Sequence, residues 1–161
     1  PLRLVGSEMC IRDRNVSMRN SIREAIENGM PSVAECGGFM YLHESMTDEE
    51  GENWPMAGII TGSCHNRGKL VRFGYVNVMG QTSHFLAGKP VRAHEFHYYD
   101  SDNNGESCVA VKPVSGTSWT CIHEDDRNWW GYPHLYYPSN PAFVEHFVQA
   151  ARLYHRERNA K

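Results

Sequence analysis

The stretch Ser17–Gly38, SMRNSIREAIENGMPSVAECGG, decides the fold because it contains a helix, a strand and a tight turn in direct succession. Its first half carries apolar residues at helical spacing, which predicts a helix over residues 18–28. Ser17 is a suitable N-cap for this helix, and Gly29 supplies the residue type that commonly ends one. We therefore expect the chain to leave this helix at Gly29 and to enter a new element.

The second half of the stretch predicts a strand that ends in a sharp turn. Residues 31–35 (PSVAE) are few and mostly apolar, as is typical of a buried parallel strand. Residues 36–38 (CGG) form the expected turn, and residues 39–43 (FMYLH) predict a short second helix. This alternation of helices with a strand indicates an α/β sheet.

The rest of the chain indicates a series of strands followed by one long helix. The acidic segment 47–53 (TDEEGEN) is expected to be an exposed loop. Strands are expected in five later segments, which Gly and Pro turns separate: 56–61, 74–79, 91–98, 109–114 and 119–122. Residues 141–156 predict the last helix, with Asn140 as its cap and Pro141 at its first position.

The composition fits one ordinary globular domain of 161 residues, of which 40% are hydrophobic and 22% charged. A net charge of −3 argues against a nucleic-acid-binding domain, and no apolar run reaches the roughly 18 residues that a membrane helix needs. The five cysteines are widely spaced and form no CxxC pair, which argues against a zinc site and favours a reducing compartment. We expect a cytoplasmic protein that binds no metal, nucleic acid or membrane.

Residues 1–14 do not share these patterns. They lack the order of regions found in a signal peptide, and they show no clear periodicity. The part GSEMCIRDR (residues 6–14) resembles translated sequencing-adapter read-through. We therefore expect residues 1–14 to be non-native and residues 15–161 to form a partial domain, truncated at its amino-terminal end.

Cys36 lies in the predicted turn between strand and helix, which is the layout of a nucleophile elbow. Gly37 and Gly38 would allow backbone and substrate to approach closely, and the Gly37 N–H could face an oxyanion. The positive end of the following helix is expected to favour the thiolate form of Cys36. The spacing alone leaves open the alternative of an inert cysteine that is packed in a turn.

A cysteine nucleophile also needs a base, and the chain has nine histidines. His134 is the better candidate because it lies in an aromatic, Pro-rich loop just before the last helix. His94 and His97 lie in AHEFHYY, where strand alternation would point them to opposite faces. The other six are expected to be surface or partly buried residues: His43, His65, His84, His123, His146 and His155.

Four motifs in a fixed order point to one known family. They are AECGGFMYL (34–42), FGYVNV (73–78), AHEFHYY (93–99) and YPHLYYPSNPAF (132–143). Together with the preceding helix they resemble the class I glutamine amidotransferase domain of cobyrinic acid a,c-diamide synthase, over residues 15–161. The resemblance implies an α/β fold with a flavodoxin-like, three-layer sheet.

The resemblance also implies roles for particular residues. Cys36 would be the thiol nucleophile and His134 its general base. Oxyanion and glutamine binding would involve Gly37, Gly38, His94, Glu95 and His97. The family usually has a second histidine two residues after the catalytic one, where this chain has Tyr136. No carboxylate stands at that position either, so a third member of a triad cannot be named.

The activity that the resemblance implies is ATP-dependent amidation of the a and c acetate side chains of cobyrinate in cobalamin biosynthesis. L-Glutamine would be the nitrogen donor. Cobyrinate, ATP and Mg²⁺ would bind an amino-terminal synthetase domain that this chain lacks, and the chain itself would hold no cofactor. The resemblance leaves room for a homodimer, and we expect the truncated chain to be inactive alone. Two alternatives remain: the amidotransferase half of nickel-sirohydrochlorin a,c-diamide synthase, and a non-catalytic folded remnant or binding domain.

Overall fold

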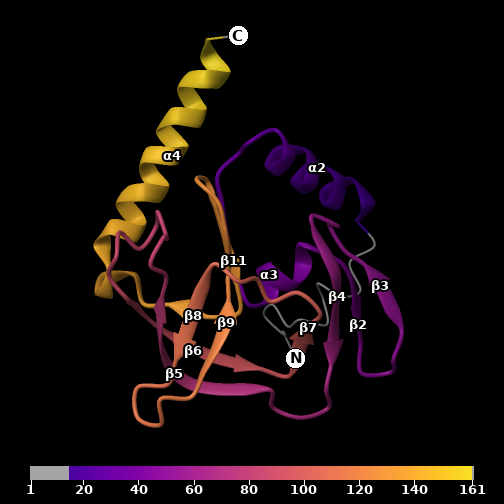
Figure 1. The fold of residues 1–161 in the computed structure, drawn as a ribbon. Coiled ribbons are helices and arrows are strands. Elements are labelled where there is room, and N and C mark those ends of the chain that lie inside the picture. The colour runs from indigo at the N-terminus through magenta and orange to yellow at the C-terminus, as the bar shows by residue number, and fades with distance from the viewer. Residues whose placement is uncertain (1–14, 161) are drawn as a thin grey trace, which may run out of the picture.

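The computed structural model describes residues 15–160 (Figure 1). The prediction that residues 1–14 are non-native lies outside the described residues. The helices are α2 (Val16–Glu27), α3 (Gly37–Tyr41), α4 (Pro141–Asn159) and the short 3-10 helix η1 (Tyr137–Ser139). No helix in the described range is long and apolar enough to cross a membrane.

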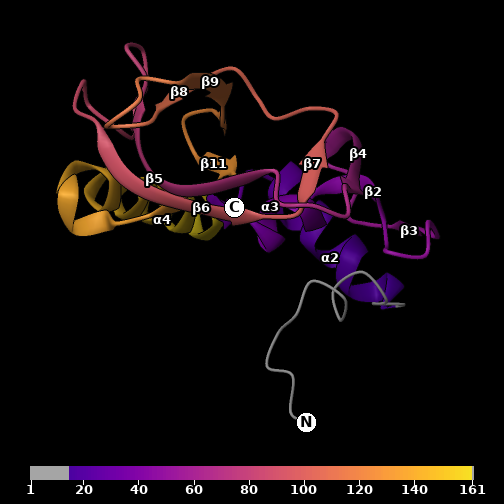
Figure 2. The same cartoon turned by 90° about the horizontal axis from the view of Figure 1, so that it is seen from below.

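The strands form three sheets. The first has the order β1 (Ser32–Glu35), β11 (Asn128–Gly131), β10 (His123–Glu124). The second has the order β12 (His134–Leu135), β6 (Val91–His97), β5 (Arg72–Met79), β8 (Cys108–Val111), β9 (Ser118–Cys121). The third has the order β3 (Asn53–Pro55), β2 (His43–Thr47), β4 (Ile60–Asn66), β7 (Tyr99–Ser101). Figures 1 and 2 show the β5–β6 pair and the third sheet at opposite ends of the molecule, with α3 and β11 between them.

Helix α2 begins slightly earlier than the sequence predicts. Its N-cap is Asn15, whose side-chain oxygen accepts a hydrogen bond from the Met18 N–H at 3.0 Å. The predicted cap at Ser17 is therefore wrong, and the Ser17 hydroxyl instead donates to Asn15 Oδ1. Gly29 follows the helix with a φ of +83°, a left-handed conformation that glycine adopts at little cost.

Strand β1 is parallel to β11, as the apolar segment 31–35 predicts. Strand β11 carries the two adjacent tryptophans, Trp129 and Trp130, which are 0% and 9% exposed. Because side chains alternate along a strand, Trp129 packs in the core around Phe85, and Trp130 packs in the core around Phe39. β11 therefore joins the two hydrophobic cores, and it holds β1 in place between them.

The segment 56–61 does not form the predicted strand. Strand β4 occupies residues 60–66 instead, and Met56 and Ala57 precede it in an irregular, buried segment. Their N–H groups donate to the carbonyls of Glu44 and Tyr41, so this backbone is satisfied without a strand of its own. The apolar character of the segment reflects burial in the core rather than strand pairing.

The predicted helix at 39–43 begins and ends two residues earlier, and His43 starts strand β2. The expectation that His43 is a surface or partly buried residue is wrong, because its side chain is fully buried. Its Nδ1 lies 3.0 Å from the Phe39 carbonyl, and its Nε2 lies 2.7 Å from the Ser101 hydroxyl. Burial lowers the pKa of this imidazole, so it is a neutral group that is satisfied by two neighbours.

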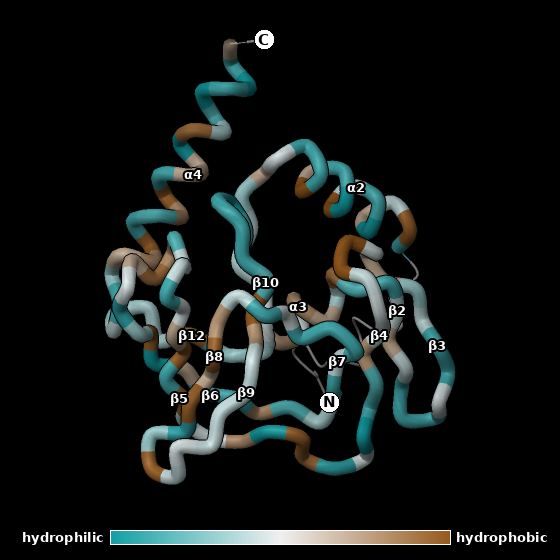
Figure 3. Tube along the Cα trace, in the orientation of Figure 1, coloured by the Kyte–Doolittle hydropathy of each residue, from teal (hydrophilic) through white to brown (hydrophobic). Residues whose placement is uncertain are grey.

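The other predicted strands correspond to β5, β6, β8 and β9, with ends that shift by a few residues. Helix α4 begins at Pro141 as predicted and extends to Asn159. Asn140 precedes it, but its side chain does not cap the helix. It donates to the carbonyls of Leu86 and Lys89 instead, both at 3.0 Å. Figure 3 shows hydrophobic and hydrophilic segments alternating along α2 and α4, as in helices with one buried face.

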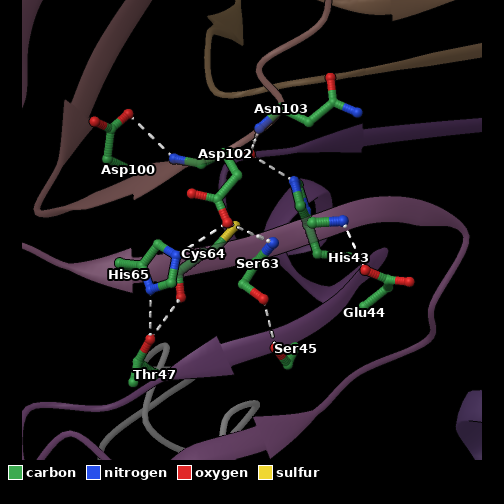
Figure 4. A network of polar contacts seen from close by, with 12 residues as sticks. His43, Glu44, Ser45, Thr47, Ser63, Cys64, His65, Asp100, Asp102 and Asn103 are labelled. Atoms are coloured by element: carbon green, nitrogen blue, oxygen red, sulfur yellow. Dashed lines mark hydrogen bonds and ion pairs between the residues drawn. The ribbon is translucent and has the colours of Figure 1, made fainter.

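A polar network connects three strands of the third sheet (Figure 4). His65 of β4 lies 2.8 Å from the Thr47 hydroxyl of β2 and 3.1 Å from the carboxylate of Asp102, just beyond β7. The hydroxyls of Ser45 and Ser63 meet at 2.7 Å across the same pair of strands. This network ties β2, β4 and the end of β7 together.

Candidate active site

Cys36 is the single residue that connects β1, which ends at Glu35, to α3, which begins at Gly37. Its φ of +48° and ψ of −106° are rarely adopted by a residue with a side chain. Two hydrogen bonds hold this backbone: the Cys36 N–H donates to the Gly131 carbonyl, and the Cys36 carbonyl accepts from the Met40 N–H, both at 2.9 Å. Such a conformation costs about 1–3 kcal/mol and is typically found where function requires it.

The two glycines after Cys36 differ in their surroundings. A β-carbon added at Gly37 would meet no atom of the described chain within 4 Å, so the space in front of this residue is open. A β-carbon at Gly38 would touch the Ala34 side chain at an ordinary 3.6 Å. Open space beside the turn is what a substrate needs to approach the cysteine and the Gly37 N–H.

The Cys36 thiol does not have the lowered pKa that the sequence suggests. Burial raises its pKa, the hydrogen bond from the Gly37 backbone lowers it, and the charges of Glu95 and Glu35 raise it further. The expectation of a favoured thiolate is therefore wrong. Helix α3 has only five residues, and its positive end does not outweigh desolvation and two nearby carboxylates.

His134 lies close to this turn, beside Glu35. It begins β12, opposite His94 of β6, and its side chain is 49% exposed. Within the described chain, no hydrogen bond joins the His134 ring to Cys36. The nearest charged partner is Glu35, whose Oε2 lies 3.9 Å from His134 Nδ1. His134 also lines an open pocket of about 680 Å³ together with Arg92 and Tyr136.

Glu35 is the residue of this site that sequence reasoning missed. Its Oε1 accepts a 2.6 Å hydrogen bond from the Tyr137 hydroxyl and a 3.3 Å hydrogen bond from the Leu135 N–H. Glu35 therefore joins the end of β1 to the segment that carries His134. The signal that could have found it is a carboxylate at the end of an otherwise apolar strand, directly before the cysteine.

The AHEFHYY motif divides between the two faces of β6, as its spacing predicts. His94 lies on the outer face, with its ring centroid 5.6 Å from that of Phe73 and 5.3 Å from that of Tyr75. Glu95 and His97 are buried on the inner face, at 1% and 4% exposure. The structure therefore separates His94 from the other two members of the predicted set.

Glu95 is surrounded by protein donors. Its Oε1 accepts from the Trp119 indole N–H at 3.3 Å, and its Oε2 lies 3.3 Å from His97 Nε2 and 3.7 Å from Arg72 Nε. These partners explain how a carboxylate remains in a buried position. Its charge contributes to the raised pKa of Cys36, which places Glu95 within electrostatic range of the thiol.

The described residues offer no evident metal site: no three His, Cys, Asp or Glu side chains gather in a group that could hold an ion. Three further cysteines in this range, Cys64, Cys108 and Cys121, are buried free thiols. Burial raises the pKa of Cys64 and of Cys121 to about 12. These three thiols are therefore protonated at neutral pH and shielded from reagents, whereas Cys36 is partly exposed.

Comparison with solved structures shows which fold this chain shares. A chain described as "Crystal structure of glutamine amidotransferase" matches 86% of this chain and 70% of its own length, with a TM-score of 0.57 and 14% identity. This likeness shows that the chain has the class I glutamine amidotransferase fold.

The family follows from the sequence comparisons. The model of the CobB/CobQ-like glutamine amidotransferase domain matches residues 7–142, so the chain belongs to this family. Its curated relatives include cobyrinate a,c-diamide synthases of Salmonella typhimurium, 33% identical over 86% of this chain, and of Fusobacterium nucleatum, 35% identical over 81%. The matched regions cover 31% and 30% of those two proteins, so this chain spans less than a third of their length.

Proposed function

We propose that this chain is the glutaminase part of a cobyrinate a,c-diamide synthase, the part of that enzyme that releases ammonia from L-glutamine. The observation that carries the proposal is the strained Cys36 turn, which the hydrogen bond to Gly131 holds in place, in a chain of the CobB/CobQ-like family. The names of the relatives support cobyrinate, rather than nickel-sirohydrochlorin, as the acceptor of the nitrogen.

The proposed reaction begins at the thiol. His134 accepts the Cys36 proton, and the sulfur attacks the side-chain carboxamide carbon of glutamine. The Gly37 N–H stabilises the oxyanion, a type of contact whose loss typically costs about 3–4 kcal/mol of activation free energy. Protonated His134 then donates to the leaving nitrogen, ammonia departs, and water hydrolyses the glutamyl thioester to glutamate.

The raised pKa of Cys36 and its separation from His134 both bear on this reaction. Catalytic hydrogen bonds are often long before substrate binds and shorten in the complex. We therefore expect glutamine to bring the His134 ring and the thiol together. An imidazolium beside the sulfur would then lower the thiol pKa in the bound state.

The second half of the reaction is the ATP-dependent amidation of cobyrinate, and we place it in a part of the enzyme other than the described residues. The sequence contains no GxxxxGK[ST] motif, and the described chain groups no side chains that fit a metal ion. We assign ATP, Mg²⁺ and cobyrinate to a separate synthetase domain, in which ATP would supply the energy to activate the carboxylate, and we place the whole reaction in the cytoplasm.

A glutamine analogue with a diazoketone group, 6-diazo-5-oxo-L-norleucine, tests the glutaminase proposal. The diazo carbon takes up a proton and the Cys36 thiolate attacks it, which expels N₂ and leaves a thioether whose added mass is located by peptide mass spectrometry. We expect one adduct at Cys36, suppressed by L-glutamine but not by D-glutamine. The buried thiols Cys64, Cys108 and Cys121 are internal controls, and Cys36→Ser is the matched variant. An unlabelled Cys36, or labelling that glutamine does not suppress, would support a non-catalytic folded domain instead.

A further inference from the structure

We propose that Glu35 is the positioning carboxylate of His134, the role for which the sequence offers no residue after the histidine. This inference rests on the proposed glutaminase function. In this arrangement, Glu35 faces Nδ1 of the ring, so that the ring proton stays on Nδ1 and Nε2 is left as the base. Glu35 acts through His134 and does not touch the substrate.

The two oxygens of Glu35 have separate tasks. Oε1 is held by the Tyr137 hydroxyl at 2.6 Å and by the Leu135 N–H at 3.3 Å. Oε2 faces His134 Nδ1 at 3.9 Å. Both donors to Oε1 come from the segment that carries His134. These two hydrogen bonds therefore fix the position of the carboxylate relative to the His134 backbone.

Tyr137 is suited to be a permanent anchor. Burial raises the pKa of its phenol, and the hydrogen bond to Glu35 and the charge of that carboxylate raise the pKa further. The phenol therefore remains a donor at any pH at which the enzyme would work. Its ring packs against Phe143 of α4, with centroids 5.3 Å apart, which limits its movement.

The negative charge of Glu35 has opposite effects on the two neighbouring catalytic groups. The Glu35 charge raises the pKa of the neighbouring Cys36, which by itself disfavours the nucleophile. A carboxylate facing an imidazole selects the tautomer protonated on the near nitrogen and stabilises the imidazolium that forms during catalysis. Closing 3.9 Å to a hydrogen bond needs a movement of about 1 Å, and catalytic hydrogen bonds that are long in the free enzyme often shorten when substrate binds.

The tautomer of His134 tests the inference directly. In Glu35→Gln the amide oxygen can still accept from Tyr137 and Leu135, so the anchor remains while the charge is lost. Long-range ¹H–¹⁵N NMR of this chain, without glutamine, reports which nitrogen of each histidine ring carries the proton. We expect mostly Nδ1–H at His134 in the parent chain and a clear shift toward Nε2–H in Glu35→Gln.

Asp102→Asn is the matched control, because it removes the same charge beside a different histidine, His65. It should alter the His65 signals and leave those of His134 unchanged. If Glu35→Gln does not fold, Tyr137→Phe takes its place, since it frees one anchor of the carboxylate and should shift the tautomer in the same direction by less. Identical His134 signals in the folded variant and in the parent chain would overturn the inference.

Kinetics separate this inference from the proposed function. In a preparation that hydrolyses glutamine, Glu35→Gln should lower kcat by at least about 10-fold and change KM by less than about twofold, since no substrate contact is lost. If Cys36 is not labelled by the glutamine analogue, the glutaminase proposal fails while the NMR result still reports on Glu35. If Cys36 is labelled but the tautomer does not change, only the positioning role fails.

Discussion

The imidazole ring of His97 stacks on the phenol ring of Tyr132, with ring centroids 3.8 Å apart and ring planes 3° from parallel. The His97 Nδ1 lies 2.6 Å from the Tyr99 carbonyl, and Nε2 lies 3.3 Å from the Glu95 carboxylate, so the histidine ring is held at both nitrogens. Tyr132 precedes His134 by one intervening residue. The stack therefore attaches the beginning of the His134 segment to the inner face of β6.

Removing the Tyr132 ring should destabilise the fold strongly. Tyr132 is 4% exposed and packs against both His97 and Phe39. We expect Tyr132→Ala to lower the free energy of unfolding by about 3–5 kcal/mol, as for other large-to-small changes in a core. Tyr132→Phe keeps the stack and loses only the hydroxyl contact with Cys64, so it should cost less than about 1.5 kcal/mol. Urea unfolding measures both, and equal losses would contradict a role for the stack.

Glycine at position 36 should be more stable than alanine. Cys36 has a φ of +48°, and the left-handed conformation costs a residue with a side chain about 1–3 kcal/mol. Glycine relieves this strain but loses about 0.5–1 kcal/mol through the greater freedom of the unfolded chain. We expect the free energy of unfolding of Cys36→Gly to exceed that of Cys36→Ala by about 1 kcal/mol in urea titrations. A less stable glycine variant would show that the turn is not strained.

The buried thiols should make the protein lose stability at alkaline pH. The pKa of Cys64 and of Cys121 is raised to about 12, chiefly by burial, whereas a thiol in an unfolded chain has a pKa of about 8.5. Between these values the unfolded chain releases the protons and the folded chain keeps them. Their contribution is therefore complete below about pH 8.5 and is lost as the pH rises toward 12, by about 1.4 kcal/mol per pH unit and thiol.

Urea unfolding at pH 7.5, 9 and 10 measures this slope. Cys64→Ala should show a shallower decline than the parent chain, by about 1.4 kcal/mol per pH unit. Cys36→Ala is the comparison at a partly exposed thiol. A slope that Cys64→Ala leaves unchanged would mean that the folded protein does not protect this proton.

Local patterns in the sequence were sufficient where neighbouring residues decide the structure. The strand before Cys36, a sharp turn at Cys36 and the start of α4 at Pro141 follow from short-range steric preferences and agree with the structure, although Gly37 and Gly38 belong to α3 rather than to the turn. The apolar segment 56–61 was misread because a buried irregular segment and a buried strand share the same composition. The burial of His43 could not be seen, since its partner Ser101 comes from β7, far along the chain.

The sequence by itself determined the family, the position of Cys36 in a turn between a strand and a helix, and the opposite orientations of His94 and His97, because these depend on local spacing and motif order. Only the tertiary structure decided the pKa of Cys36 and the contact of Glu35 with the His134 segment. Both depend on desolvation and on charges that folding brings together. The hydrogen bond between Glu35 and Leu135, for example, joins residues that are 100 positions apart in the chain. The carboxylate directly before Cys36 is visible in the sequence, but its pairing with residues so far along the chain leaves no periodic or local signature.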